Sequence, residues 1–231
     1  MMNLMRRALV IGGSGALGRS MVEIFRDSWE VTSVDLRENS SAHKNIILNE
    51  LQKIDDQCES CKRELTGKYD AILCVAGGFA GGSISEPEVF SKIQHLMKLN
   101  LFPCVMAGHI ATQFLAEEGL IVLTGAAACF KDTTPGIIAY ALSKTATHSL
   151  ALNLATRQDI PATSTVATIL PEVIDTPSNR DAMPNADFSK WANPRSIAAL
   201  VKMWAEGVNR PENGSFAVLK TVNGQIVPEF V

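Results

Sequence analysis

The chain has 231 residues, of which 46% are hydrophobic and 19% charged. This length and composition fit one α/β domain, residues 1–231, and exclude a disordered protein. The 21 Lys and Arg against 24 Asp and Glu give a net charge of −3, which disfavours a nucleic-acid partner because such proteins are usually basic.

The sequence carries no sign of a membrane or secretory segment. It contains no run of about 18 apolar residues, so we expect no membrane-spanning helix. The residues before Gly12 include no long apolar stretch, so we expect no cleaved signal peptide. The five cysteines are an odd number scattered along the chain, which fits a reducing cytoplasm better than a disulfide scaffold.

Short apolar runs alternate with amphipathic stretches along the chain. The runs predict strands at 8–11, 30–34, 46–48, 71–76, 120–123, 164–170 and 216–219. Residues at helical spacing predict helices at 16–26, 55–65, 87–116, 138–156 and 194–206, with Pro103 as a candidate break. We therefore predict an α/β fold: a single Rossmann-type, doubly wound parallel sheet of about seven strands with helices on both faces.

Ligands of such sheets bind outside the carboxyl ends of the strands, and the first of these ends is rich in glycine. The loop at 12–18 lies between a predicted strand and a predicted helix. Missing Cβ atoms allow a tight turn and let a pyrophosphate approach the helix N-terminus. We assign dinucleotide binding to Gly12, Gly15, Ala16, Leu17 and Gly18. The alternative is an ordinary strand–helix turn.

An acidic residue, Asp35, follows the second predicted strand. A carboxylate at this position accepts hydrogen bonds from the adenosine ribose and repels a 2′-phosphate. Asp35 therefore favours NADH over NADPH, although Arg37, two residues later, softens that preference and leaves NADPH possible. The alternative is an acid of a surface loop.

Tyr140 and Lys144 are four residues apart in a predicted helix, so they share one face. A nearby ammonium lowers the pKa of a tyrosine from about 10 toward neutrality, and such a tyrosine acts as a general acid. The spacing alone is common, but here it follows a dinucleotide-type glycine loop. We predict that the pair is catalytic.

Together, the glycine loop, Asp35, the Tyr140–Lys144 pair and the segment from Pro171 to Thr176 resemble the short-chain dehydrogenase/reductase superfamily. The superfamily usually has a catalytic serine thirteen positions before the tyrosine, where this chain has alanine. The resemblance implies further cofactor contacts at the strand ends, from Ala76, Gly77, Gly78, Val173 and Thr176.

This alanine, Ala127, indicates which branch of the superfamily the chain resembles, namely the dihydropteridine reductases. The similarity extends essentially from end to end, through the segments 12–18, 70–82, 134–136, 175–180, 183–191 and 209–211. The branch commonly has Trp in its Gly-Gly-aromatic-Ala-Gly-Gly loop, where this chain has Phe79. A phenylalanine keeps a stacking face for a flat pterin but loses the indole N–H donor.

The resemblance implies NADH-dependent reduction of quinonoid dihydropterin to tetrahydropterin, which regenerates tetrahydrobiopterin. The hydride comes from the nicotinamide and the proton from Tyr140, while Lys144 lowers the tyrosine pKa and binds the nicotinamide ribose. The resemblance also implies a substrate pocket lined by Phe79, Ala127 and Tyr140. A quinonoid pterin is already electrophilic, so it needs no serine hydroxyl. Asn100 is similar to the superfamily residue that holds a water chain feeding protons to the lysine.

Two other functions stay open. One is a short-chain reductase acting on another electrophilic acceptor, such as a quinone; the Phe79 loop and the segment 183–191 favour a pterin instead. The other is a dinucleotide sensor without catalysis, which the missing serine favours and the retained Tyr140 and Lys144 disfavour.

The remaining motifs have simple structural interpretations. Cys58 and Cys61 lack a second pair and an adjacent histidine, so we expect ordinary thiols and no metal site. Cys74 and Cys129 fit small core residues near the pocket. His148 lies four residues after Lys144 and lines the same helix.

Two larger features concern the surroundings of the site. The polar, proline-marked segment at 175–191 is either a lid over the substrate or a long surface loop. The resemblance also implies a homodimer in which the helices near 100–116 and 138–156 pack as a four-helix bundle.

Overall fold

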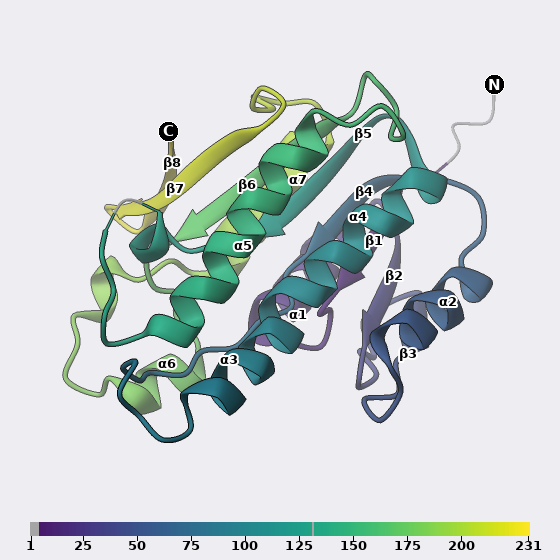
Figure 1. Ribbon diagram of the computed structural model, residues 1–231. Coiled ribbons are helices and arrows are strands. Elements are labelled where there is room, and N and C mark those ends of the chain that lie inside the picture. Colours follow the sequence, from purple (N-terminus) through teal and green to yellow (C-terminus); the bar gives the residue numbers. More distant parts are fainter. Residues whose placement is uncertain (1–4, 131) are drawn as a thin grey trace.

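Eight strands within the described residues form one continuous sheet in the order β3-β2-β1-β4-β5-β6-β7-β8 (Figure 1). The computed structural model describes residues 5–130 and 132–231. Residues 1–4 lie outside these ranges, and they belong to the N-terminal segment in which we expect no signal peptide. The strands are β1 (Arg7–Ile11), β2 (Glu30–Asp35), β3 (Lys44–Ile47), β4 (Tyr69–Cys74), β5 (Leu115–Thr124), β6 (Thr165–Pro171), β7 (Ser215–Val222) and β8 (Gln225–Phe230).

The sheet is doubly wound, as the sequence predicts. Strands β1 to β7 pair in parallel, and β8 pairs antiparallel with β7. The helices α1 (Ala16–Arg26) and α7 (Pro194–Ala205) cover one face, and α2 (Ile54–Glu64), α4 (Phe102–Phe114) and α5 (Ile138–Ala155) cover the other (Figure 1). No helix in the described ranges is long and apolar enough to cross a membrane.

The central strands are mainly apolar because both faces of the sheet are covered. In β1, Leu9 and Ile11 join the core on the α4 side, whereas Ala8 and Val10 join the core on the α1 side. Burial of alternate side chains in two separate cores accounts for the continuous apolar runs from which we predict a parallel sheet.

The eighth strand is absent from the prediction of about seven. β8 is an edge strand, largely exposed, and it contains Pro228. A proline and polar residues are typical of an edge, and they remove the apolar signal by which a buried strand is recognised.

The predicted helix at 87–116 is a composite. It consists of α3 (Val89–Leu96), a π-helical turn at Met97–Leu101, and α4, and it ends where β5 begins at Leu115. The chain does not break at Pro103, which lies in the first turn of α4, where a missing N–H is tolerated.

Candidate active site

The carboxyl ends of five parallel strands bring the predicted site residues to one edge of the sheet. Ile11 at the end of β1 pairs with Val34 of β2 and Cys74 of β4. Cys74 pairs in turn with Leu123 of β5, and Thr124 pairs with Ile169 of β6. The loops that follow these strands are therefore neighbours, although they lie far apart in the sequence.

The glycine loop packs against the loop after β4 without side chains between them. Gly12 has a positive φ of 88°, and a Cβ on it would overlap the backbone of Ala76. A Cβ on Gly18 would overlap the carbonyl oxygen of Gly12. Glycine is needed at both positions because backbone meets backbone. α1 begins at Ala16, after the N-cap residue Gly15, with no capping side chain and no acid in its first turn. The free N–H groups of that turn suit the diphosphate of a dinucleotide.

Asp35 is held in place by the backbone of the glycine loop. Its Oδ2 accepts the N–H of Ser14 at 2.9 Å, and its Oδ1 accepts the N–H of Leu36 at 2.7 Å. These bonds use part of the carboxylate's capacity of about four acceptor positions. Asp35 therefore keeps lone pairs for ribose hydroxyls.

Beside Asp35 lies a cavity that the sequence does not reveal. It has a volume of about 440 Å³ and is lined by Leu36, Arg37, Ile47, Leu48, Asn49 and Glu50. Leu36 and Ile47 are large apolar side chains that remain 46% and 52% exposed. Exposed apolar walls beside a hydrogen-bonding carboxylate suit an adenine ring and its ribose. The sequence hints at this cavity only through the apolar run that ends at Leu48, one of the residues that line it.

Lys144 is a buried ammonium next to Tyr140. Its Nζ donates to the carbonyl oxygen of Thr124 at 2.8 Å and lies 5.9 Å from the centre of the Tyr140 ring. Burial lowers the pKa of Lys144 and raises the pKa of Tyr140. The expected lowering of the tyrosine pKa is therefore wrong for this structure, because desolvation of the phenol dominates and the ammonium is directed at Thr124. A raised pKa keeps Tyr140 protonated at neutral pH, as a proton donor requires.

Asn100 joins three parts of the site through its side chain. It is fully buried; its Oδ1 accepts the N–H of Gly78 at 2.8 Å, and its Nδ2 donates to Ser143 Oγ at 2.9 Å. Ser143 in turn donates to the carbonyl oxygen of Tyr140 at 2.7 Å. The predicted proton relay through Asn100 stays a prediction. Asn100 directly connects the loop after β4 to α5, the helix that carries Tyr140 and Lys144.

Asn100 and Lys144 approach the loop after β4 closely. A Cβ on Gly77 would lie 2.9 Å from Asn100 Oδ1 and 3.4 Å from Lys144 Nζ. Asn100 belongs to the π-helical turn, a wider helical turn that is frequent at functional sites. The sequence gives no signal for this turn.

Two of the predicted substrate residues, Phe79 and Tyr140, lie against each other. Phe79 is 63% exposed, and its ring lies 5.0 Å from the ring of Tyr140 at 66°. Ala127 is partly buried and opens a short 3₁₀ turn, Ala127–Cys129. Phe79 thus presents an apolar face beside the proposed proton donor, which fits a flat heterocycle.

The segment at 175–191 is folded rather than an open loop. Its base is closed by the bridge between Ile174 and Ala192. It contains α6 (Pro177–Ala182), capped by Thr176 Oγ1, which accepts the N–H of Asn179 at 3.2 Å, and a 3₁₀ turn at Phe188–Lys190. Val173 and Thr176 lie at the start of this segment, after β6. A role as a lid stays a prediction.

All five cysteines are free thiols with buried side chains. Cys58 and Cys61 lie on the core side of α2, while Cys74 is in the core beneath the site. Cys104 Sγ lies 3.5 Å from Cys74 Sγ and 3.2 Å from the carbonyl oxygen of Asn100. The interpretation of Cys74 and Cys129 as small buried residues is confirmed.

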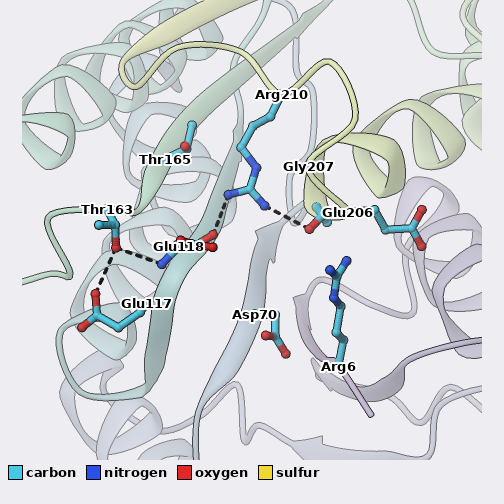
Figure 2. A pocket seen from close by; sticks show the side chains of 10 residues that line it. Arg6, Asp70, Glu117, Glu118, Thr163, Thr165, Glu206, Gly207 and Arg210 are labelled. Atoms are coloured by element: carbon cyan, nitrogen blue, oxygen red, sulfur yellow. Dashed lines mark hydrogen bonds between the residues drawn. The ribbon is translucent and has the colours of Figure 1, made fainter. Parts of the chain in front are cut away.

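A second cavity lies at the opposite edge of the sheet and contains none of the predicted site residues. It has a volume of about 530 Å³. Arg210 crosses it and donates to the carbonyl oxygen of Glu118 (Figure 2). It also donates to the carbonyl oxygens of Trp204 and Ala205. Glu118 has a positive φ of 55°. Arg210 therefore fastens the C-terminal end of α7 to the irregular first part of β5, a structural role for the segment at 209–211.

Comparisons with known proteins agree with this geometry. The family described as short chain dehydrogenase matches residues 6–187. A Dictyostelium discoideum protein named dihydropteridine reductase is 35% identical over 222 residues, 94% of this chain and 95% of that protein. A short chain dehydrogenase family structure from Francisella tularensis has a TM-score of 0.79 at 25% identity and covers 93% of this chain and 96% of that one. BdcA, solved with NADPH, shares the fold with a TM-score of 0.77 at 23% identity, over 96% of each chain.

Replacement of Asn100 tests its place in the site. Asn100→Ala leaves the N–H of Gly78 and the hydroxyl of Ser143 without their partner, which costs about 2–3 kcal/mol of unfolding free energy. We expect that loss in urea unfolding, together with at least a tenfold lower turnover. Asn153→Ala, on the exposed side of α5, should change neither quantity. Full turnover in the Asn100 variant would remove this residue from the working site.

Proposed function

The chain belongs to the short-chain dehydrogenase family of oxidoreductases, and we propose that it is an NADH-dependent dihydropteridine reductase. It reduces quinonoid dihydropterin to tetrahydropterin. The observation that carries the proposal is the exposed Phe79 ring against Tyr140, next to a turn that has Ala127 in place of a serine. The dihydropteridine reductase of Dictyostelium discoideum, which is similar over 94% of the chain, supports it.

The residues at the strand ends fit a nicotinamide dinucleotide. The uncapped start of α1 suits the diphosphate, and the cavity beside Asp35 suits the adenosine. Lys144 has three N–H donors, of which one is used by Thr124, and the others suit the nicotinamide ribose. Asp35 disfavours a 2′-phosphate, so NADH is the proposed cofactor and NADPH a weaker one.

The reaction needs one hydride and one proton for each dihydropterin. The bound nicotinamide supplies the hydride to the electrophilic ring. Tyr140 donates the proton from its hydroxyl, since burial keeps that hydroxyl protonated. The ammonium of Lys144, 5.9 Å from the centre of that ring, holds the nicotinamide ribose next to it. Phe79 holds the flat pterin in line, which is the main requirement for an acceptor that is already electrophilic.

A homodimer and a cytoplasmic location complete the proposal. Val105 of α4 and Leu142 and Leu152 of α5 are 45%, 43% and 53% exposed. Burying these side chains between two copies of the chain removes them from water. The five free thiols suit a reducing compartment.

Light scattering tests the dimer. We expect a mass of about twice the 24.9 kDa of the chain. Leu152→Glu, which places a charge on the proposed contact, should shift the mass to that of one chain. A wild-type protein that stays monomeric at micromolar concentration contradicts the proposal.

The function is tested by following NADH oxidation with quinonoid dihydrobiopterin generated in situ, in parallel with NADPH. We expect rapid turnover and a higher kcat/KM with NADH. No turnover despite NADH binding would refute the pterin substrate, and activity with a quinone would identify the other acceptor class. Binding of NADH without turnover of either acceptor would favour a sensor.

Asp35 is tested in the same assay. Asp35→Ala removes ribose hydrogen bonds and the charge that repels a 2′-phosphate, so we expect about tenfold weaker NADH binding and a narrower NADH preference. Glu38→Ala is the matched control, because it removes the same charge from an exposed neighbour. An unchanged cofactor ratio in the Asp35 variant excludes its role.

Tyr140 is tested by removal of one oxygen atom. Tyr140→Phe keeps the ring contact with Phe79 but removes the proton donor, so kcat should fall about 100-fold or more while NADH binding is unchanged. The chain has one other tyrosine, Tyr69, which is buried near Thr32 and Arg7. Tyr69→Phe should keep normal turnover. Normal turnover in the Tyr140 variant would assign the proton to another group.

A further inference from the structure

His148 lies one helical turn beyond Lys144 on α5, and it holds the backbone that follows β5. The side chain is buried, and its Nε2 accepts the N–H of Ala126 at 3.2 Å. A Cβ on Gly125 would overlap the same ring. The imidazole is therefore packed directly against residues 125 and 126, at the start of the turn that carries Ala127.

The turn held by His148 also faces the catalytic pair. Cys129 is the last residue of the 3₁₀ turn, and it contributes to the raised pKa of Tyr140. The turn at 125–129 therefore has His148 packed against its start and, at its end, a thiol near enough to influence Tyr140. Any displacement of this turn changes the wall against which a substrate next to Tyr140 rests.

Aromatic rings enclose the imidazole on its other sides. Phe130, which follows the turn, lies 5.5 Å from it at 66°, and Phe216 of β7 lies 5.7 Å from it at 84°. Lys144 on α5 is the charged group that acts on the ring, and the Cys129 thiol of the turn has its own pKa raised by burial. Burial and the nearby ammonium lower the pKa of His148 to about 4.

The hydrogen bond requires one particular form of the ring. Nε2 can accept from Ala126 only when it carries no proton, so the neutral imidazole must bear its hydrogen on Nδ1. Protonation places an N–H opposite the N–H of Ala126 and a second positive charge one turn from Lys144. Both effects break the contact.

We propose that His148 is a positioning residue: its neutral imidazole holds the turn at 125–129, and with it Ala127, in place beside Tyr140. The part of this inference that concerns catalysis rests on the proposed reductase function. The part that concerns the turn does not depend on any substrate. The buried bond makes the turn sensitive to acid, because the folded protein binds a proton at His148 less readily than the unfolded chain does.

The ionisation of His148 is measured first, without substrate. The chain has four histidines, so ¹H–¹⁵N spectra of the ring nitrogens can resolve each, and His148→Gln assigns the signal. We expect a protonated Nδ1 at neutral pH and a pKa near 4, against about 6.5 for an exposed histidine. A pKa near 6.5, or a hydrogen on Nε2, overturns the proposal whether or not the protein reduces pterins.

Two substitutions then separate positioning from packing. His148→Phe fills the space but removes the acceptor, whereas His148→Gln retains an acceptor oxygen and does not titrate. We expect kcat/KM for the pterin to fall at least tenfold in the Phe variant, with NADH binding within twofold of normal, and to recover largely in the Gln variant. His43→Gln is the control, since exposed His43 also accepts a main-chain N–H, from Val31 at the far end of β2.

The pH profile completes the test. Tyr140 is protonated throughout the acidic range, so it gives no loss of activity there. We expect the wild-type melting temperature to decrease as the pH falls from 6.5 toward 4, and the wild-type rate to decrease only near pH 4, where His148 of the folded protein takes up its proton. Both decreases should be smaller in His148→Gln. Identical acid profiles in the two proteins contradict the proposal. If no pterin turnover is found, the melting profiles still decide whether His148 holds the turn.

Discussion

A buried ammonium is the constraint on which the site depends. Lys144 is 3% exposed and donates to a backbone carbonyl, that of Thr124 at the end of β5. Removing a charge from water costs several kcal/mol unless oxygen atoms replace the solvent. The strand end supplies one such oxygen, and ribose hydroxyls are suited to supply others. The ammonium therefore joins α5 to the end of β5, at the place where we propose that the cofactor ribose binds.

The helix α5 carries Lys144 together with two other side chains of the candidate site. Tyr140, Lys144 and His148 follow one another at intervals of four residues, so they project along one side of the helix. Tyr140 faces the exposed Phe79, Lys144 reaches Thr124, and His148 accepts from Ala126. One rigid element thus positions the hydroxyl of Tyr140 and the ammonium beside it, and also holds the backbone that follows β5.

Hydrogen bonds between buried groups hold the neighbouring loops to this helix. Asn100 connects Gly78 to Ser143, and the glycines at 12, 18 and 77 allow backbone segments to approach where a side chain would intrude. The contacts of Asn100, Gly12 and Gly77 join segments that are distant in the sequence. A buried network of this kind is stable only when its members are all present, since a lost partner leaves a polar group unsatisfied in the interior.

The sequence by itself determined the features that depend on local spacing. Alternating apolar runs predict the doubly wound sheet, the glycines at 12, 15 and 18 predict the loop, and the interval from Tyr140 to Lys144 predicts a shared helix face. Tertiary structure decided what depends on neighbours from other strands: the eighth strand, the π-helical turn at Asn100, the cavity beside Asp35, the raised pKa of Tyr140 and the acceptor role of His148. Burial and hydrogen-bond partners arise only when distant segments meet, so no short stretch of sequence encodes them.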